Sequence, residues 1–222
     1  MITRALFVGC LAASSPDSVD LLALQTLSVG TWIAPEWKTR GVRGKLAPLA
    51  TVHDAADGRF LRIEGTDRAA FFVREFPAPV SAERGRLTIS WRVPLAPAGA
   101  DLRAARSDDS PLRIFVVFQT AGRFRATPRT IFYSSGAKEP ATFSRPSERS
   151  TDLHVMRITE SGNDSEWSRL TVQPAVDYAQ VWGGTVPCII AIGLMQDTDA
   201  TRSHAVAELR HLFWRASDVT SH

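Results

Sequence analysis

Cysteine and lysine are scarce in this 222-residue chain. There are two cysteines, Cys10 and Cys188, and no paired cysteine motif of the kind that binds zinc. Lysine occurs at three positions, so nearly all of the 26 basic residues are arginines, and these are scattered along the chain. A nucleic-acid binder would be expected to cluster them on one stripe with aromatic residues between. The composition therefore argues against nucleic acid as a partner.

The sequence also lacks the local motifs of the commonest enzyme classes. It contains no nucleophile elbow and no glycine-rich phosphate loop. None of the histidines has the i, i+4 spacing of a zinc-binding helix, which argues against a transition-metal site. The five histidines are His53, His154, His204, His211 and His222.

The first fifteen residues, Met1–Ser15, resemble an export signal. A positive start at Arg4 precedes a short apolar stretch and then small residues. The apolar part is too short for a membrane span of about 20 residues, so we expect no integral membrane span. We predict removal of residues 1–15 and a periplasmic or secreted mature protein of one domain, residues 16–222. Cys188 would then be left without a partner, as a small buried residue.

The remaining chain has the pattern of an all-β protein. The most apolar stretch, Leu112–Phe118, has apolar residues on both faces, as expected of a central strand. Pro174–Trp182 opens with proline and is followed by Gly183-Gly184, which predicts one short helix. Further strands are expected at Phe60–Glu64, Ala70–Phe76, Leu87–Val93, Thr130–Tyr133, Leu153–Thr159, Trp167–Val172, Cys188–Met195 and Ala205–Trp214. This series favours an antiparallel β-sandwich, with a jelly roll as the preferred topology.

A polar loop with two adjacent carboxylates, Asp108 and Asp109, runs directly into the central strand. Arg113 enters that strand as a single charge. An unpaired buried charge would cost several kcal/mol, so one interpretation pairs Arg113 with Asp108 or Asp109. The alternative is that the three residues belong to a ligand or metal site.

A second pair of carboxylates, Asp197 and Asp199, follows the apolar stretch that ends at Met195. Residues two apart in an extended segment project in the same direction, so both could bind one cation, for which structural Ca²⁺ is the best candidate. The alternative is a turn in which each aspartate accepts hydrogen bonds from backbone amides. A glycoside hydrolase could also use two such carboxylates, about 5 to 9 Å apart, if the loops of Asp108 or Asp109 and of Asp197 or Asp199 met.

Tyr133 and Trp167 are candidate aromatic ligand-binding residues. Together with arginines of the polar loop 134–150, they could form a platform with a polar rim for an oligosaccharide. The competing interpretation is that Trp167 fills the core.

Several of these motifs together resemble a bacterial family of exported proteins known as domain of unknown function 3047. The likeness covers Gly30 to Trp214. The motifs are Ala98-Gly99-Ala100-Asp101-Leu102-Arg103, Ser107-Asp108-Asp109 with the strand after it, Tyr133, Trp167, Asp177-Tyr178 and Gly193-Leu194-Met195-Gln196-Asp197-Thr198-Asp199. The chain departs from the family pattern at Ser134-Ser135, at Ala200 and at His211-Leu212.

The resemblance implies an exported β-sandwich similar to carbohydrate-binding modules, with no established activity. We therefore expect an exported domain that binds a carbohydrate or another cell-envelope ligand. A glycoside-active enzyme with paired carboxylates and a structural or protein-interaction domain are the alternatives. Sequence leaves the oligomeric state open.

Overall fold

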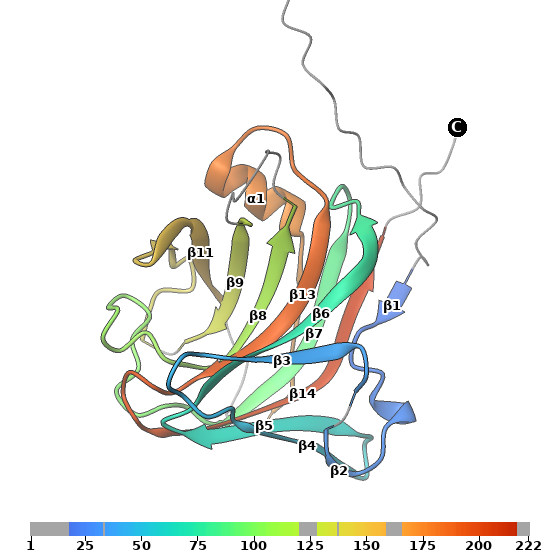
Figure 1. Ribbon diagram of the computed structural model, residues 1–222, viewed down its shortest axis with the longest axis vertical. Helices are drawn as coiled ribbons and strands as arrows, with labels where there is room; N and C mark the ends of the chain where they lie inside the picture. The colour runs from blue at the N-terminus through green and yellow to red at the C-terminus, as the bar shows by residue number, and fades with distance from the viewer. Residues whose placement is uncertain (1–17, 33, 120–127, 137, 159–165, 217–222) are drawn as a thin grey trace, which may run out of the picture.

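The computed structural model describes residues 18–32, 34–119, 128–136, 138–158 and 166–216, and in these residues two seven-stranded sheets pack face to face (Figure 1). The first sheet has the order β12 (Ser168–Val172), β7 (Arg86–Leu95), β14 (His204–Arg215), β5 (Phe60–Thr66), β4 (Leu49–His53) and β2 (Gly30–Thr31), with β1 (Ser18–Asp20) on β14. The second sheet has the order β10 (Ser144–Ser147), β11 (Ser150–Ile158), β9 (Thr130–Ser135), β8 (Ser110–Phe118), β13 (Ile189–Asp197), β6 (Ala69–Val80) and β3 (Trp37–Gly41). The predicted β-sandwich is confirmed.

The core lies between the two sheets and takes one side of every long strand. Strand β8 contributes Leu112, Ile114, Val116 and Phe118, each fully buried. The opposite sheet contributes alternate residues of β7 and β14 to the core. The largest of these side chains, Trp91 and Trp214, are also fully buried. The period-two pattern in the sequence thus places one side of each strand in a shared apolar layer.

The short helix α1 (Pro174–Trp182) has the predicted bounds. Pro174 occupies the first turn, where its missing N–H needs no partner, and Gly183 follows the last turn with φ of 67°. Tyr178 packs from the helix against Phe118 of the core, with ring centroids 4.8 Å apart. The helix covers one end of the second sheet (Figure 1).

Several elements differ from the prediction. Residues 19–27, whose type the sequence left open, form the end of β1 and a 3₁₀ turn, η1 (Leu24–Thr26). The polar loop 134–150 contains β10, and the chain returns through it so that β11 pairs with β9 in parallel. Strands β2, β3 and β4 were not predicted: β2 and β3 are short edge strands with mostly exposed side chains, and β4 has only five residues, of which Ala50 and Val52 are buried. Cys188, expected as a small buried residue, is half-buried.

Among the described helices, none is long and apolar enough to cross a membrane. The segment expected to be an export signal, residues 1–15, lies outside the described residues.

Candidate functional site

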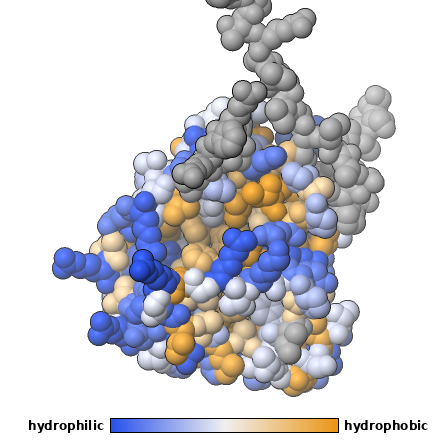
Figure 2. All heavy atoms as spheres, viewed as in Figure 1, coloured by the Kyte–Doolittle hydropathy of each residue, from blue (hydrophilic) through white to orange (hydrophobic). Residues whose placement is uncertain are grey.

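The outer side of the second sheet carries a second apolar cluster, which we name the apolar face. It consists of the buried residues Val73, Phe115, Ala191 and Met195 and the half-buried residues Val42, Phe71, Val117 and Phe132. Figure 2 shows an apolar hollow, bordered by hydrophilic side chains, on the side of the molecule where this sheet lies. These side chains lie outside the core between the two sheets. An apolar patch on the outer side of a sheet commonly marks a binding surface.

Three phenyl rings cross the apolar face from strand to strand. The rings of Phe71 and Phe115 have centroids 5.8 Å apart, and those of Phe115 and Phe132 have centroids 5.6 Å apart. Strand β13 lies between the strands that carry Phe71 and Phe115. It presents Gly193 there, and an added Cβ would lie 2.1 Å from Cζ of Phe115. The missing side chain therefore lets the Phe115 ring lie across β13 and reach Phe71.

Charged side chains border the apolar face at the β3 edge. Lys38 and Arg40 pair in register with Val73 and Phe71, so they point to the same side of the sheet. Their nitrogens contact the Glu75 carboxylate at 2.7 and 2.6 Å. All three side chains are well exposed, so they can exchange these contacts for contacts with a ligand.

A polar row closes one end of the apolar face. The row consists of Arg113, Ser134 and Arg157, which are register partners across β8, β9 and β11, and Met195 of the apolar face lies opposite Arg113 on β13. Arg113 is 5% exposed and Ser134 is fully buried. This end of the face is therefore polar but mostly closed to solvent.

Three carboxylates meet next to this polar row. Asp109, Asp197 and Asp199 each offer one oxygen, and these oxygens lie within 4.8 Å of one another. We name Asp109, Asp197 and Asp199 the three-carboxylate group. Asp109 comes from the loop before β8, and the other two come from the end of β13 and the turn that follows. The sequence indicated a meeting of these loops as one alternative, and the fold brings them together because β8 and β13 are neighbours.

Asp109 holds the turn after β13. Its Oδ1 accepts a hydrogen bond from the N–H of Ala200 at 3.1 Å, and its Oδ2 accepts from the N–H and the hydroxyl of Thr201 at 2.7 and 2.6 Å. Asp109 is 1% exposed, so these bonds satisfy a carboxylate that water does not reach. The loop before β8 and the turn after β13 are thus fastened together by one side chain.

Arg113 binds differently from the prediction. Its guanidinium donates to the backbone carbonyl of Asp108, and its ion-pair partner is Asp197, with 3.8 Å between Nη2 and Oδ2. The expected pairing with the side chain of Asp108 or Asp109 is therefore replaced by a pairing across two neighbouring strands. The register between β8 and β13 explains this pairing, because Met195 lies opposite Arg113 and β13 bulges between Met195 and Asp197.

The pKa of Asp197 is raised to about 7. Burial is the largest cause because it disfavours the charged form, and the nearby carboxylates of Asp199, Asp109 and Asp108 add to the rise. Arg113 opposes the rise. One guanidinium therefore faces several carboxylates and does not offset their burial and mutual repulsion.

Tyr133 lies in the core and not at the surface. It is 2% exposed on the inner side of β9, and its hydroxyl donates to Oδ2 of Asp177 on α1 at 2.6 Å. Burial raises its pKa well above the usual value for tyrosine. In the structure Tyr133 fastens the helix to the second sheet.

Trp167 is half-buried beside β12, at the edge of the first sheet. The guanidinium carbons of Arg210 and Arg92 lie 3.9 and 4.7 Å from the centre of its ring system, and the ring of Phe60 lies 6.0 Å away. Trp167 and Tyr133 belong to opposite sheets, so they do not form one platform. The aromatic surface on the second sheet comes instead from phenylalanines that the sequence analysis assigned to strands and not to a site.

Sequence analysis missed Phe71, Phe132 and Gly193 as site residues. Strand β8 is buried on both sides, as its apolar residues on both faces indicate, but the sequence does not tell which of the two apolar sides packs against the other sheet. Phe71-Phe72 and Phe115 share this ambiguity, because only the packing of the two sheets decides which ring faces out.

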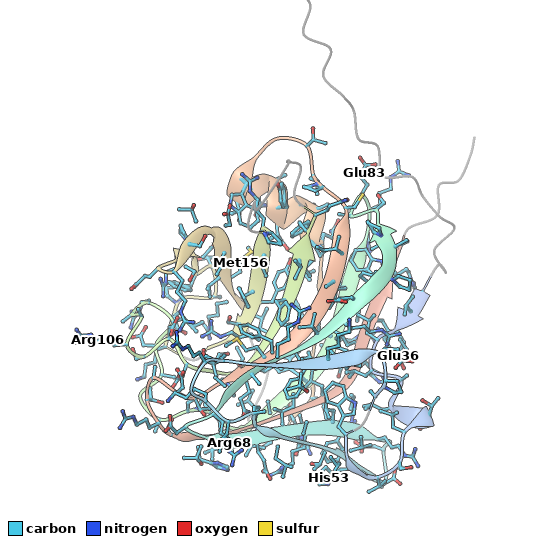
Figure 3. The ribbon with its side chains drawn as sticks, in the orientation of Figure 1. Glu36, His53, Arg68, Glu83, Arg106 and Met156 are labelled. Atoms are coloured by element: carbon cyan, nitrogen blue, oxygen red, sulfur yellow. The ribbon has the colours of Figure 1, made fainter. Side chains whose placement is uncertain are left out.

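Two hollows lie elsewhere on the described surface. One of about 260 Å³ is lined by residues that include Asp109, Lys138, Glu139 and Pro97. The other, about 520 Å³ and open, is lined by residues that include Glu64, Arg68 and His204. Figure 3 labels Arg68 at this lower side of the molecule, and Arg106 on the loop before β8, pointing outward. Neither hollow is lined by an aromatic ring apart from the imidazole of His204, which separates both from the apolar face.

Comparison with solved structures finds sandwiches of similar outline at very low identity. A family 11 carbohydrate-binding module of a cellulosomal cellulase of Clostridium thermocellum matches at 8% identity with a TM-score of 0.49, covering 94% of this chain and 100% of that chain. The xyloglucanase domain of a type three effector from Sinorhizobium fredii matches at 8% identity with a TM-score of 0.47, covering 85% and 98%. A xylan-binding domain from Paenibacillus barcinonensis matches at 16% identity with a TM-score of 0.39, covering 89% and 91%. At these values the likeness assigns no ligand to this chain.

Comparison by sequence gives a family and no characterised relative. No curated protein matches the chain. The family model described as "Protein of unknown function (DUF3047)" matches residues 35–213, which span both sheets, the apolar face and the three-carboxylate group. The chain therefore belongs to the DUF3047 family of proteins of unknown function.

Proposed function

We propose that this domain binds a carbohydrate chain of the cell envelope or cell wall across the apolar face of the second sheet. The observation that carries the proposal is the row of three phenyl rings of Phe71, Phe115 and Phe132, on the side of the molecule where Figure 2 shows an apolar hollow with hydrophilic borders. A sugar ring has an apolar side that packs on an aromatic ring and hydroxyls at its edge that need polar partners. A surface of rings with polar borders matches both requirements.

The polar borders favour a carbohydrate over a purely apolar ligand. Lys38, Arg40 and Glu75 present donors and acceptors beside the rings and are exposed by about half, with side-chain exposures of 62%, 60% and 43%. An acyl chain offers these groups no hydrogen bonds, whereas hydroxyls can both donate to Glu75 and accept from Lys38 and Arg40. The edge therefore supports a polyhydroxylated ligand lying against the rings.

The catalytic alternative receives less support from the carboxylates. A glycosidase needs an acid and a base on either side of an accessible bond. Here Asp109 is 1% exposed with both oxygens hydrogen-bonded, and Asp197 is 5% exposed. A polysaccharide would not reach either group without a rearrangement of the loops, so we favour binding over hydrolysis.

Ring-deletion variants test the proposal directly. Binding of soluble xylan, mixed-linkage β-glucan, galactan and peptidoglycan fragments is measured by affinity electrophoresis and calorimetry for the wild type, Phe71→Ala and Phe132→Ala. Phe213→Ala is the matched control, since Phe213 is a half-buried phenylalanine on the other sheet, stacked on His211. We expect each ring deletion on the apolar face to weaken binding about tenfold or more, equivalent to ~1.4 kcal/mol, and the control to bind as the wild type. No binding to any of these glycans, or an equal loss of affinity in Phe213→Ala, would contradict the proposal.

We also propose that the protein is exported to the periplasm or secreted. The support is the leader-like sequence Met1–Ser15. Cell fractionation with N-terminal sequencing tests this: we expect a mature chain lacking about a dozen residues or more outside the cytoplasm, and a full-length cytoplasmic product would contradict it.

A further inference from the structure

The three-carboxylate group joins segments far apart in the sequence. Asp109 precedes β8, whereas Asp197 and Asp199 lie at the end of β13, yet one oxygen from each falls within 4.8 Å of the others. Asp109 and Asp197 are 1% and 5% exposed. Carboxylates this close and this buried repel one another unless a cation, an arginine or backbone N–H groups offset their charge.

Backbone N–H groups satisfy Asp109 but not Asp197. Both oxygens of Asp109 accept hydrogen bonds from the turn 200–201. Oδ1 of Asp197 is buried and has no hydrogen-bond partner among the described residues. A buried charged oxygen without a hydrogen-bond partner is costly and rare, so Oδ1 of Asp197 is free to coordinate a cation.

Arg113 does not fill that role. Its Nη2 is 3.8 Å from Oδ2 of Asp197, beyond hydrogen-bond distance, and its Nε has no partner among the described residues either. The guanidinium is directed instead to the carbonyl of Asp108. A single arginine held at this distance offsets part of the negative charge and leaves the Asp197 oxygen unbound.

We propose that Asp109, Asp197 and Asp199 together bind one divalent cation of the calcium class, which links the loop before β8 to the turn after β13. The group offers only carboxylate oxygens, which suit a hard cation and not zinc or copper. Ca²⁺ takes oxygens at about 2.3–2.6 Å, so its ligands lie up to about 5 Å apart, and three oxygens within 4.8 Å of one another can share one such ion.

Calcium fits this site better than magnesium. Mg²⁺ demands near-ideal octahedral geometry and usually keeps several waters. Two of the three carboxylates are almost fully buried, and Asp109 is already held by three hydrogen bonds, so the site has little freedom to rearrange. Asp199 is half-buried, which gives an ion access from solvent. The flexible coordination of Ca²⁺ accepts these fixed ligands.

The ion stabilises the fold and is separate from sugar binding. The site lies beyond the polar row Arg113–Ser134, whereas the rings of Phe115 and Phe132 belong to the next row of the sheet. Cation binding therefore raises the stability of the two loops without contacting a ligand on the apolar face, so failure of one proposal leaves the other intact.

Thermal unfolding with and without metal tests the proposal. The purified protein is stripped with EDTA, dialysed, and melted with no metal, with CaCl₂ or with MgCl₂, and Ca²⁺ binding is measured by calorimetry. At about a hundredfold excess over the dissociation constant, we expect Ca²⁺ to raise Tm by roughly 5–10 °C and Mg²⁺ to raise it much less.

Two variants and a matched control assign the effect to the group. Asp199→Asn keeps a half-buried side chain of the same shape and should fold, and Asp197→Asn removes the carboxylate whose oxygen lacks a partner. Both are expected to lose the Ca²⁺ shift. Asp101→Asn changes an aspartate of the same loop that binds Arg103 instead, and it should keep the shift. No calorimetric signal and no shift in the wild type, an equal shift with Mg²⁺, or a full shift in Asp199→Asn would overturn the proposal.

Discussion

Arg113 and Asp197 face each other across two neighbouring strands, with 3.8 Å between Nη2 and Oδ2, and each residue is 5% exposed. The pair joins β8 to β13 at the point where the apolar face ends and the three-carboxylate group begins. At this distance, Nε of Arg113 and Oδ1 of Asp197 have no hydrogen-bond partner in the part of the chain that the structure describes. Arg113 is therefore the only described guanidinium in contact with this buried negative charge.

Removing Arg113 is expected to destabilise the fold. Arg113→Ala leaves the Asp197 carboxylate buried without a counter-charge, which should lower the free energy of unfolding by ~3 kcal/mol or more. Urea unfolding in EDTA measures this loss. In the double variant with Asp197→Asn the loss should be smaller, because the uncompensated charge is gone. A single variant that unfolds with the wild type would show that the pair has no structural role.

Gly193 is expected to be intolerant of any side chain. Its φ is not in the left-handed region, so the constraint is the ring of Phe115, which an added Cβ would meet at 2.1 Å. Gly193→Ala should therefore lower stability by about 1–3 kcal/mol and weaken any binding on the apolar face. Gly41→Ala in β3 is the control, since nothing lies within 4 Å of its Cβ position.

The same contact can be tested by a double-mutant cycle. In a Phe115→Leu background the Gly193→Ala change should cost clearly less, because the shorter side chain leaves space. Thermal and urea unfolding of the four proteins give the coupling. If Gly193→Ala lowered stability equally in both backgrounds, the Phe115 ring would not be what excludes a side chain at position 193.

Asp177 is expected to make stability depend on pH. Burial raises its pKa above the usual value, and the hydrogen bond from Tyr133 opposes part of the rise. The folded protein therefore keeps this proton to higher pH than the unfolded chain, whose aspartate pKa is about 3.9, and the free energy of unfolding falls as pH rises from there through the folded-state pKa. Asp177→Asn should flatten this slope, as measured by urea unfolding from about pH 4 to about pH 7.

Tyr133→Phe should strengthen the pH dependence of stability that Asp177→Asn removes, and it serves as a check. It removes the hydrogen bond that lowers the pKa of Asp177, so the fall in stability should extend to higher pH. Identical pH profiles for the wild type and both variants would contradict this account of the Tyr133–Asp177 contact.

Trp167 is expected to support structure and not the ligand. It lies at the edge of the first sheet under Arg210 and Arg92, away from the apolar face. Trp167→Ala should lower stability by roughly 1–3 kcal/mol, through lost packing and cation–π contacts, and leave glycan affinity unchanged. Loss of glycan binding in a variant that remains folded would restore the ligand role predicted from the sequence.

The sequence by itself determined the fold class and most of the strands. The run Leu112–Phe118, apolar on both faces and rich in β-branched and aromatic residues, indicates a buried extended strand, and proline and glycine set the ends of α1. It also identified Asp109, Arg113, Asp197 and Asp199 as residues whose charge needs a partner, because burial of a charge is costly wherever it occurs. These properties depend on side chains and near neighbours, so they can be inferred from order along the chain.

Only the tertiary structure decided which partners these residues have and which apolar side faces out. Register between β8 and β13 placed Arg113 against Asp197, and strand order brought Asp109 to the turn after β13. The packing of one sheet on the other buried Tyr133 and left Phe71 and Phe132 outside. Alternation fixes that neighbouring residues lie on opposite sides of a strand, but where both sides are apolar, only contact with the other sheet determines which side becomes the core.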